Sequence, residues 1–168
     1  AHTEAVAYYE IAKQHQVNAP ARERAELLLA LANEQYMVSR LRDAIASVNE
    51  TFPLWTELGD DTGLATAHVA VGVYEYYSAN RQSAESHLGR AAEIAYGTGA
   101  STVYSEAQIH RAFLAFMRGD VSGTASLLAD TASASDEELR LWNKVVSDSV
   151  ALSTGEVDSR RRLLDHME

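Results

Sequence analysis

The sequence predicts an all-α protein built from repeated pairs of antiparallel helices. Residues of similar size return every 40 positions without an insertion, no segment alternates as a β-strand does, and only two prolines occur. Self-similarity at a fixed period of this length is typical of solenoids made of helix pairs. Four columns carry the repeat: a small column of the first helix (Ala32, Gly72, Ala112), an aromatic column (Tyr36, Tyr76, Phe116), a small column of the second helix (Ala44, Ala84, Thr124) and a large column (Val48, Leu88, Leu128).

Nine helices follow from the apolar spacing and from short breaking segments. A helix over residues 3–16 ends at Val17-Asn18-Ala19-Pro20, where Asn18 is the expected N-cap and Pro20 lies in the next first turn. Later breaks fall at Ser39-Arg40, at the stop and cap Gly59 to Thr62, at the loop Gly97 to Ser101 and at Gly155. Ser135 and Glu138 form an expected capping box. The remaining helices are expected over residues 20–38, 41–58, 63–78, 81–96, 102–118, 121–132, 136–152 and 156–167.

The small columns have a physical role in this arrangement. Two or three residues join the helices of a pair, so the two helices must run antiparallel and close together. A large side chain at either small column would push the pair apart, whereas the large column fills the space between successive pairs.

Composition excludes several classes of function. The formal net charge is −10 and the sequence pI is about 5.0, which argues against direct nucleic-acid binding and against docking on anionic membranes. The chain has no cysteine, no apolar run of membrane-spanning length and no opening secretory signal, so we expect a cytoplasmic protein. Because Ala1 already lies in an amphipathic stretch and no helix stop precedes Glu168, we interpret the chain as a fragment of a larger protein.

No motif indicates catalysis. The sequence contains no phosphate-binding loop, no Gly-x-Ser-x-Gly elbow and no histidine pair with the spacing of a zinc helix. His68 and Glu75 share a helix face, but we expect a packed or solvated histidine there rather than a metal ligand. Arg160-Arg161-Arg162 is expected to be a solvated helix face rather than an anion site. We therefore expect a protein that is not an enzyme and that holds no cofactor or metal.

The columns resemble the tetratricopeptide repeat (TPR), most clearly in the second repeat with Gly72, Tyr76, Ala84, Leu88 and Ala91. The period is 40 rather than the usual ~34 residues, Thr124 replaces an alanine, and the signature Trp and Pro are missing. The resemblance implies one TPR-like domain over residues 1–168, wound as a right-handed superhelix. Its parts would be the second helix of a truncated repeat (1–17), repeat one (20–59), repeat two (62–97), repeat three (102–133) and a degenerate repeat four (136–168).

A narrower resemblance involves Leu54-Trp55-Thr56-Glu57-Leu58-Gly59-Asp60, the following Gly63, and the opening helix Glu4 to Ala12. Together they resemble the helical-repeat region of large bacterial transcriptional regulators of the STAND class. Those regulators carry an N-terminal ATPase and a C-terminal LuxR-type helix-turn-helix. The resemblance implies a sensor or scaffold for signal transduction, with ATP and DNA handled by other modules.

The TPR resemblance also implies a concave groove lined by the first helix of each repeat. The residues at its positions form an apolar ladder with little charge, and exposed apolar surface usually marks a contact site. Alternatively, these side chains pack between helices, or a neighbouring helix or a second copy of the chain covers them. The ladder comprises Leu29, Asn33, Tyr36 and Met37; Val69, Val73, Tyr76 and Tyr77; and Ile109, Phe113, Phe116 and Met117.

Two functions follow. The first is a non-catalytic module whose groove binds a protein partner or a small effector. The second is a purely structural role, in which the repeats form a homodimer or space the domains of a signalling protein. A peptide clamp that grips a C-terminal carboxylate with lysines is disfavoured, because the only lysines are Lys13 and Lys144, outside repeats one to three.

Overall fold

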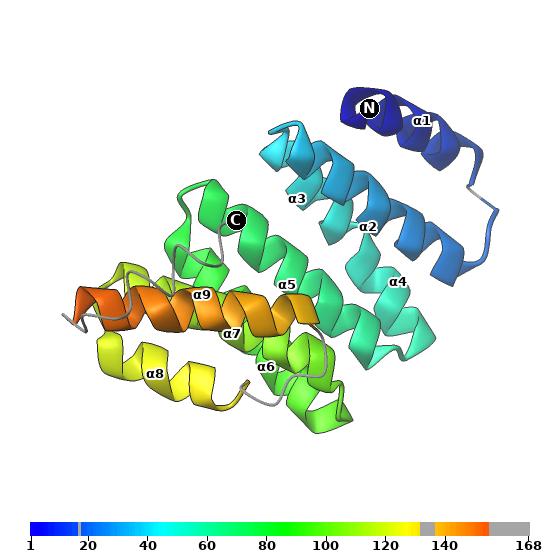
Figure 1. The fold of residues 1–168 in the computed structure, drawn as a ribbon. Coiled ribbons are helices and arrows are strands. Elements are labelled where there is room, and N and C mark those ends of the chain that lie inside the picture. The colour runs from blue at the N-terminus through cyan, green and yellow to red at the C-terminus, as the bar shows by residue number, and fades with distance from the viewer. Residues whose placement is uncertain (17, 132–136, 155–168) are drawn as a thin grey trace. The chain divides into compact units, whose positions relative to one another are not determined.

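The computed structural model describes residues 1–16, 18–131 and 137–154, and within these residues the chain forms helices and no strand (Figure 1). The predicted all-α class is confirmed. The chain divides into two compact units between residues 99 and 100. Unit 1 contains α1 (His2–His15), α2 (Ala21–Met37), α3 (Leu41–Asn49), α4 (Thr51–Leu58), α5 (Asp61–Tyr77) and α6 (Arg81–Thr98). Unit 2 contains α7 (Ser101–Met117), α8 (Val121–Ala129) and α9 (Glu137–Ser153).

The single helix expected over residues 41–58 is wrong, because the chain forms two helices, α3 and α4, that meet at Glu50. Pro53 lacks the N–H that would donate to the carbonyl of Asn49, and its ring would clash with that carbonyl in a continuous helix. The hydroxyl of Thr51 donates to the carbonyl of Val48 at 2.7 Å and satisfies a group near the break. The break lets α4 pack on both α2 and α5.

Several predicted helix ends shift by one to three residues. Asn18 is not the N-cap of α2, because Pro20 occupies that position and no side chain caps the helix. The expected loop at Gly97 is also wrong: α6 continues to Thr98, and Gly99 ends it with a left-handed φ of 71°. The stop and cap expected over Gly59 to Thr62 are present: Gly59 ends α4, and Asp60 caps α5 with a carboxylate that accepts from the amide of Gly63 at 2.8 Å. The Ser135–Glu138 capping interaction and the helix expected over 156–167 lie outside the described residues.

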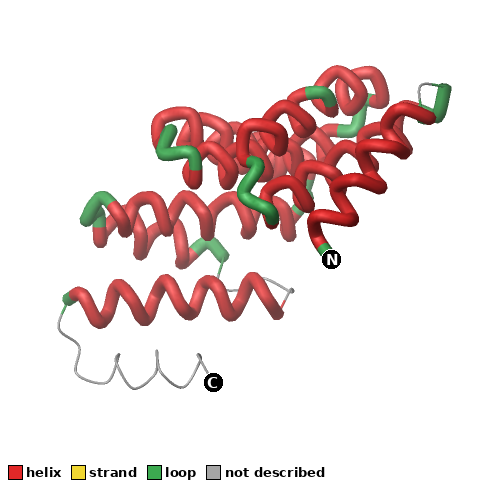
Figure 2. The backbone as a smooth tube through the Cα atoms, turned by 90° about the horizontal axis from the view of Figure 1, so that it is seen from above, coloured by secondary structure: helices red, strands yellow, loops and turns green. Residues whose placement is uncertain are grey.

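Short loops join the helices (Figure 2), and the turn inside each helix pair returns with the same backbone geometry every 40 residues. Ser39, Ala79 and Gly119 have φ values of 62°, 63° and 80°. Only one of the three is glycine, so the repeat imposes this left-handed conformation on residues that normally avoid it. The amide of the following residue then donates to the carbonyl five positions earlier: Arg40 to Gln35 at 2.8 Å, Asn80 to Glu75 at 2.9 Å and Asp120 to Ala115 at 3.0 Å.

The two small columns lie buried where α2 packs on α3, α5 on α6 and α7 on α8. Every alanine of these columns is 0% exposed. A Cβ added to Gly72 would lie 2.6 Å from Cγ of Leu88 and 3.3 Å from the carbonyl oxygen of Ala84. Thr124 replaces an alanine, and its hydroxyl donates to the carbonyl of Asp120 at 2.7 Å. The prediction that slim residues mark the close helix contacts is confirmed.

Candidate functional site

Four tyrosines from α2 and α5 form a cluster in unit 1. The rings of Tyr36 and Tyr74 stack with centroids 4.9 Å apart. Tyr36 also meets Tyr77 at 5.4 Å, and Tyr77 meets the edge of Tyr76 at 5.2 Å. Aromatic contacts of this kind contribute about 0.5–1.5 kcal/mol each beyond area burial. The cluster therefore fixes the C-terminal end of α5, the first helix of repeat two, against the corresponding helix of repeat one.

The tyrosine cluster runs from the core to the surface. Tyr74 is 6% exposed and anchors it, whereas Tyr77 is 56% exposed. Burial raises the pKa of Tyr36 to about 12, and its hydrogen bond with Tyr77 acts in the same direction. Tyr36 therefore stays neutral at physiological pH, and the cluster presents rings and hydroxyls without charge.

The predicted ladder is graded along each first helix. At its N-terminal end, Val69 and Ile109 are 3% exposed and contribute to packing. At its C-terminal end, Met37, Tyr77 and Met117 occupy equivalent positions and are 51%, 56% and 46% exposed. Groove lining stays a prediction, and the exposed apolar residues of the ladder all lie at this C-terminal end. The other ladder residues are partly buried (Leu29, Tyr36, Val73, Tyr76, Phe113 and Phe116) or exposed (Asn33).

The motif that carries the narrower resemblance forms a packed junction. Trp55 is 3% exposed, and a Cβ added to Gly63 would lie 2.6 Å from its ring. The guanidinium of Arg22 lies 5.7 Å from the Trp55 ring centroid and pairs with the Asp60 carboxylate at 2.7 Å. The hydrogen bond from the Gly63 amide, aided by Arg22, lowers the pKa of Asp60. These residues tie α2, α4 and the start of α5 together.

The structure pairs His68 with His87, a contact that sequence reasoning missed. Their Nδ1 atoms lie 2.9 Å apart between α5 and α6, and the ring of Phe52 lies 4.7 Å from that of His68. Burial lowers the pKa of His68 to about 4, with the charge of His87 acting in the same direction, and burial also lowers the pKa of His87. The two residues lie 19 positions apart on either side of a turn, so no linear spacing pointed to the pair.

Neither a metal centre nor a membrane span is found in the described part of the chain. No group of three or more His, Asp or Glu side chains there could hold a metal ion. No helix there combines the length and apolar character that crossing a membrane requires.

Comparison with protein-family models finds no match, and comparison with curated proteins finds none either. Among solved structures, the crystal structure of BtubC (BKLC) from P. vanneervenii is similar to this chain, with a TM-score of 0.76 and 13% sequence identity. The similarity covers 98% of this chain and 70% of that one. At this identity the similarity establishes a shared helical fold alone.

Proposed function

We propose that this chain is a non-catalytic, TPR-like module that binds an apolar segment of a protein partner at the exposed end of its ladder in unit 1. One observation carries the proposal: Met37 on α2 and Tyr77 on α5 lie 40 residues apart and are each about half exposed. Large apolar side chains held at the surface in register favour a contact site over chance exposure. Met and Tyr are also enriched at protein interfaces.

The chemistry of the surface restricts the partner. In unit 1, the ring of Tyr36 at the end of α2 meets that of Tyr77 on α5, and the exposed Met37 follows Tyr36 in sequence. A protein with a formal net charge of −10 attracts positively charged partners. The partner is therefore an apolar segment flanked by lysine or arginine.

Selection from a displayed peptide library tests the binding role directly. Peptides selected on the full chain should be apolar with basic flanks. They should lose at least about tenfold in affinity, roughly 1.4 kcal/mol, against a Met37→Ser, Tyr77→Ser variant. A Tyr8→Ser, Ile11→Ser variant is the matched control, because these α1 side chains are 74% and 53% exposed but lie outside the ladder. Equal loss in both variants would contradict the proposal.

Self-association of the chain is the competing function, since a second copy could cover the same side chains. Sedimentation of the wild type and the ladder variant separates the two. A monomer that binds the selected peptides supports the binding module. A dimer that dissociates on Met37→Ser, Tyr77→Ser substitution supports the structural role instead.

The narrower resemblance extends the proposal to a biological setting. We propose that the module is the sensor or scaffold region of a cytoplasmic bacterial transcriptional regulator, in which partner binding shifts the population of domain arrangements. The gene on either side of this sequence tests the idea. It should encode an ATPase with a phosphate-binding loop upstream and a helix-turn-helix downstream, and flanks that encode neither would contradict it.

A further inference from the structure

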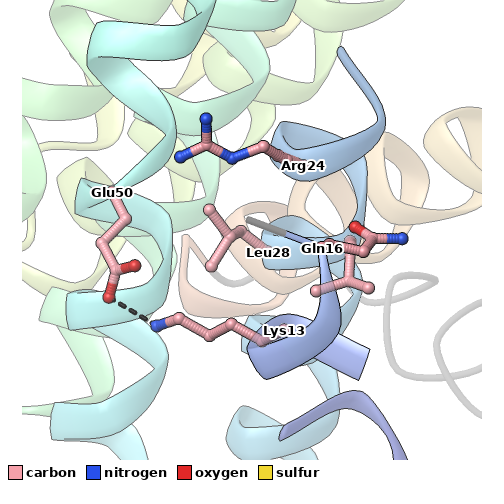
Figure 3. A pocket seen from close by; sticks show the side chains of 6 residues that line it. Lys13, Gln16, Arg24, Leu28 and Glu50 are labelled. Atoms are coloured by element: carbon pink, nitrogen blue, oxygen red, sulfur yellow. Dashed lines mark hydrogen bonds and ion pairs between the residues drawn. The ribbon is translucent and has the colours of Figure 1, made fainter. Parts of the chain in front are cut away.

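Two features of unit 1 bring polar side chains from different elements together. One is a half-enclosed pocket of about 190 Å³ between α1, α2 and Glu50 (Figure 3). The Nζ of Lys13 already pairs there with Oε1 of Glu50 at 2.7 Å, so this pocket does not single out one kind of ligand. The other feature is the His68–His87 pair between α5 and α6, which is more specific, because imidazole nitrogen is the commonest metal ligand in proteins.

The distance between the two Nδ1 atoms of the pair, 2.9 Å, fits a square-planar ion. A metal ion holds imidazole nitrogens at about 2.0–2.1 Å, so two nitrogens at adjacent corners of a square plane lie about 2.9 Å apart. Two corners of a tetrahedron would lie about 3.3 Å apart, and the two ends of a linear site about 4 Å apart. Cu²⁺ and Ni²⁺ favour the square-planar arrangement, and Cu²⁺ binds nitrogen ligands more tightly than Ni²⁺ or Zn²⁺ does.

The two rings can exchange their hydrogen bond for a metal ion without a change in their own charge. In the hydrogen bond, one Nδ1 carries a proton and the other accepts it. Transfer of that proton through solvent to Nε2 of the same ring leaves both Nδ1 lone pairs free and both rings neutral. Burial lowers the pKa of His68 and of His87, so protons do not compete for these nitrogens at neutral pH.

The charges around the pair favour a cation on balance. The carboxylate of Glu75 acts to raise the pKa of His87, against the larger effect of burial, so its negative charge reaches the pair. The positive charge of Arg90 acts to lower the pKa of His68. The guanidinium of Arg90 is itself paired with the carboxylate of Glu93 at 3.1 Å, which compensates part of its charge.

We propose that His68 and His87 bind a Cu²⁺ ion through their Nδ1 atoms, at adjacent corners of its square plane. Water fills the other corners, because no third His, Asp or Glu of the described residues completes the group. The ring of Phe52 lies 4.7 Å from that of His68 and 6.3 Å from that of His87, so it packs on both ligands. The site uses no side chain of the ladder and is independent of the binding role proposed for it.

Titration of the ¹⁵N-labelled full chain with CuCl₂ tests the site by NMR. Paramagnetic Cu²⁺ broadens the signals of nearby amides, so those of Phe52, His68 and His87 should lose intensity first. A His2→Gln background removes the competing site that the amino group of Ala1 and the imidazole of His2 would form. Electron paramagnetic resonance of the equimolar complex should show one tetragonal species with two nitrogen ligands. Broadening that begins elsewhere, or a spectrum without two nitrogen ligands, would overturn the proposal.

Three variants in the same background identify the ligands. In His87→Asn, the side-chain Nδ2 takes the position of Nδ1 and can still donate to His68, but it is a poor ligand for Cu²⁺. The affinity for Cu²⁺ should therefore fall at least about tenfold, and His68→Gln should have the same effect. His15→Gln changes an exposed histidine of α1 and should leave the affinity unchanged. Retained affinity in His87→Asn, or an equal loss in His15→Gln, would refute the assignment. Circular dichroism checks that each variant is folded.

Discussion

Replacement of Gly72 by alanine tests whether a slim residue is required where α5 meets α6. The added Cβ would lie 2.6 Å from Cγ and 2.9 Å from Cδ2 of Leu88, which is 1% exposed and has no free space to enter. Overpacking of this kind costs about 1–3 kcal/mol, and the better helix propensity of alanine offsets about 1 kcal/mol. Because the Cβ also meets the backbone oxygen of Ala84, we expect a net loss of about 1–2 kcal/mol in the free energy of unfolding.

Gly89 supplies the matched control within the same helix pair. It lies inside α6, and a Cβ added there meets no atom within 4 Å, so Gly89→Ala should gain about 0.5–1 kcal/mol from helix propensity alone. The two alanine variants should therefore differ by about 1.5–3 kcal/mol.

Urea unfolding measures this difference. A Trp142→Phe background leaves Trp55, which is 3% exposed in unit 1, as the single fluorescent tryptophan. If Gly72→Ala proves as stable as Gly89→Ala, the close contact at the small column does not limit packing, and the structural reasoning about the repeat fails.

Three further changes have calculable outcomes. Gly63→Ala places a Cβ 2.6 Å from the buried ring of Trp55 and should lower the free energy of unfolding by about 1–2 kcal/mol, so an unchanged urea midpoint would contradict the tight junction. Ala79→Gly relieves a positive φ of 63° in a turn and should raise stability by about 1 kcal/mol; a loss of stability would refute the strain. Burial lowers the pKa of both His68 and His110 from 6.5 to about 4, so the unfolded chain takes up protons first as the pH falls. The stabilisation that the two neutral histidines contribute should be fully present above pH 6.5 and lost as the pH falls from 6.5 to 4. The loss should be about 3 kcal/mol for His110 and about half as much for the more solvated His68. The His110→Gln substitution should flatten this pH dependence in urea titrations.

The features that recur along the chain could be predicted from the sequence. Gly72 and Ala84 predicted a close helix contact because small residues are needed wherever two backbones approach each other. The 40-residue period then predicted the equivalent residues in the other repeats. The break at Glu50 was missed because the apolar spacing continues through Pro53, and only the missing N–H of the proline divides the helix. Asn18 looked like a cap, but Pro20 with its fixed φ begins the helix without one.

Features that depend on contacts between distant residues could not be predicted. His68 and His87 meet across two helices, so no local spacing relates them. The change from buried to exposed residues along the ladder also depends on contacts between distant residues. Val69 and Tyr77 belong to one apolar series in the sequence, and only the packing of the neighbouring helices decides that the first is buried and the second exposed.

Oxidative footprinting of methionine tests the proposed binding surface most directly. Met37 lies at the exposed end of the ladder in unit 1 and is about half exposed, so hydrogen peroxide should convert it rapidly to the sulfoxide in the free chain at low concentration. Mass spectrometry should then find Met37 protected when a selected apolar peptide is bound. Slow oxidation in the free chain, or unchanged oxidation in the complex, would contradict the account.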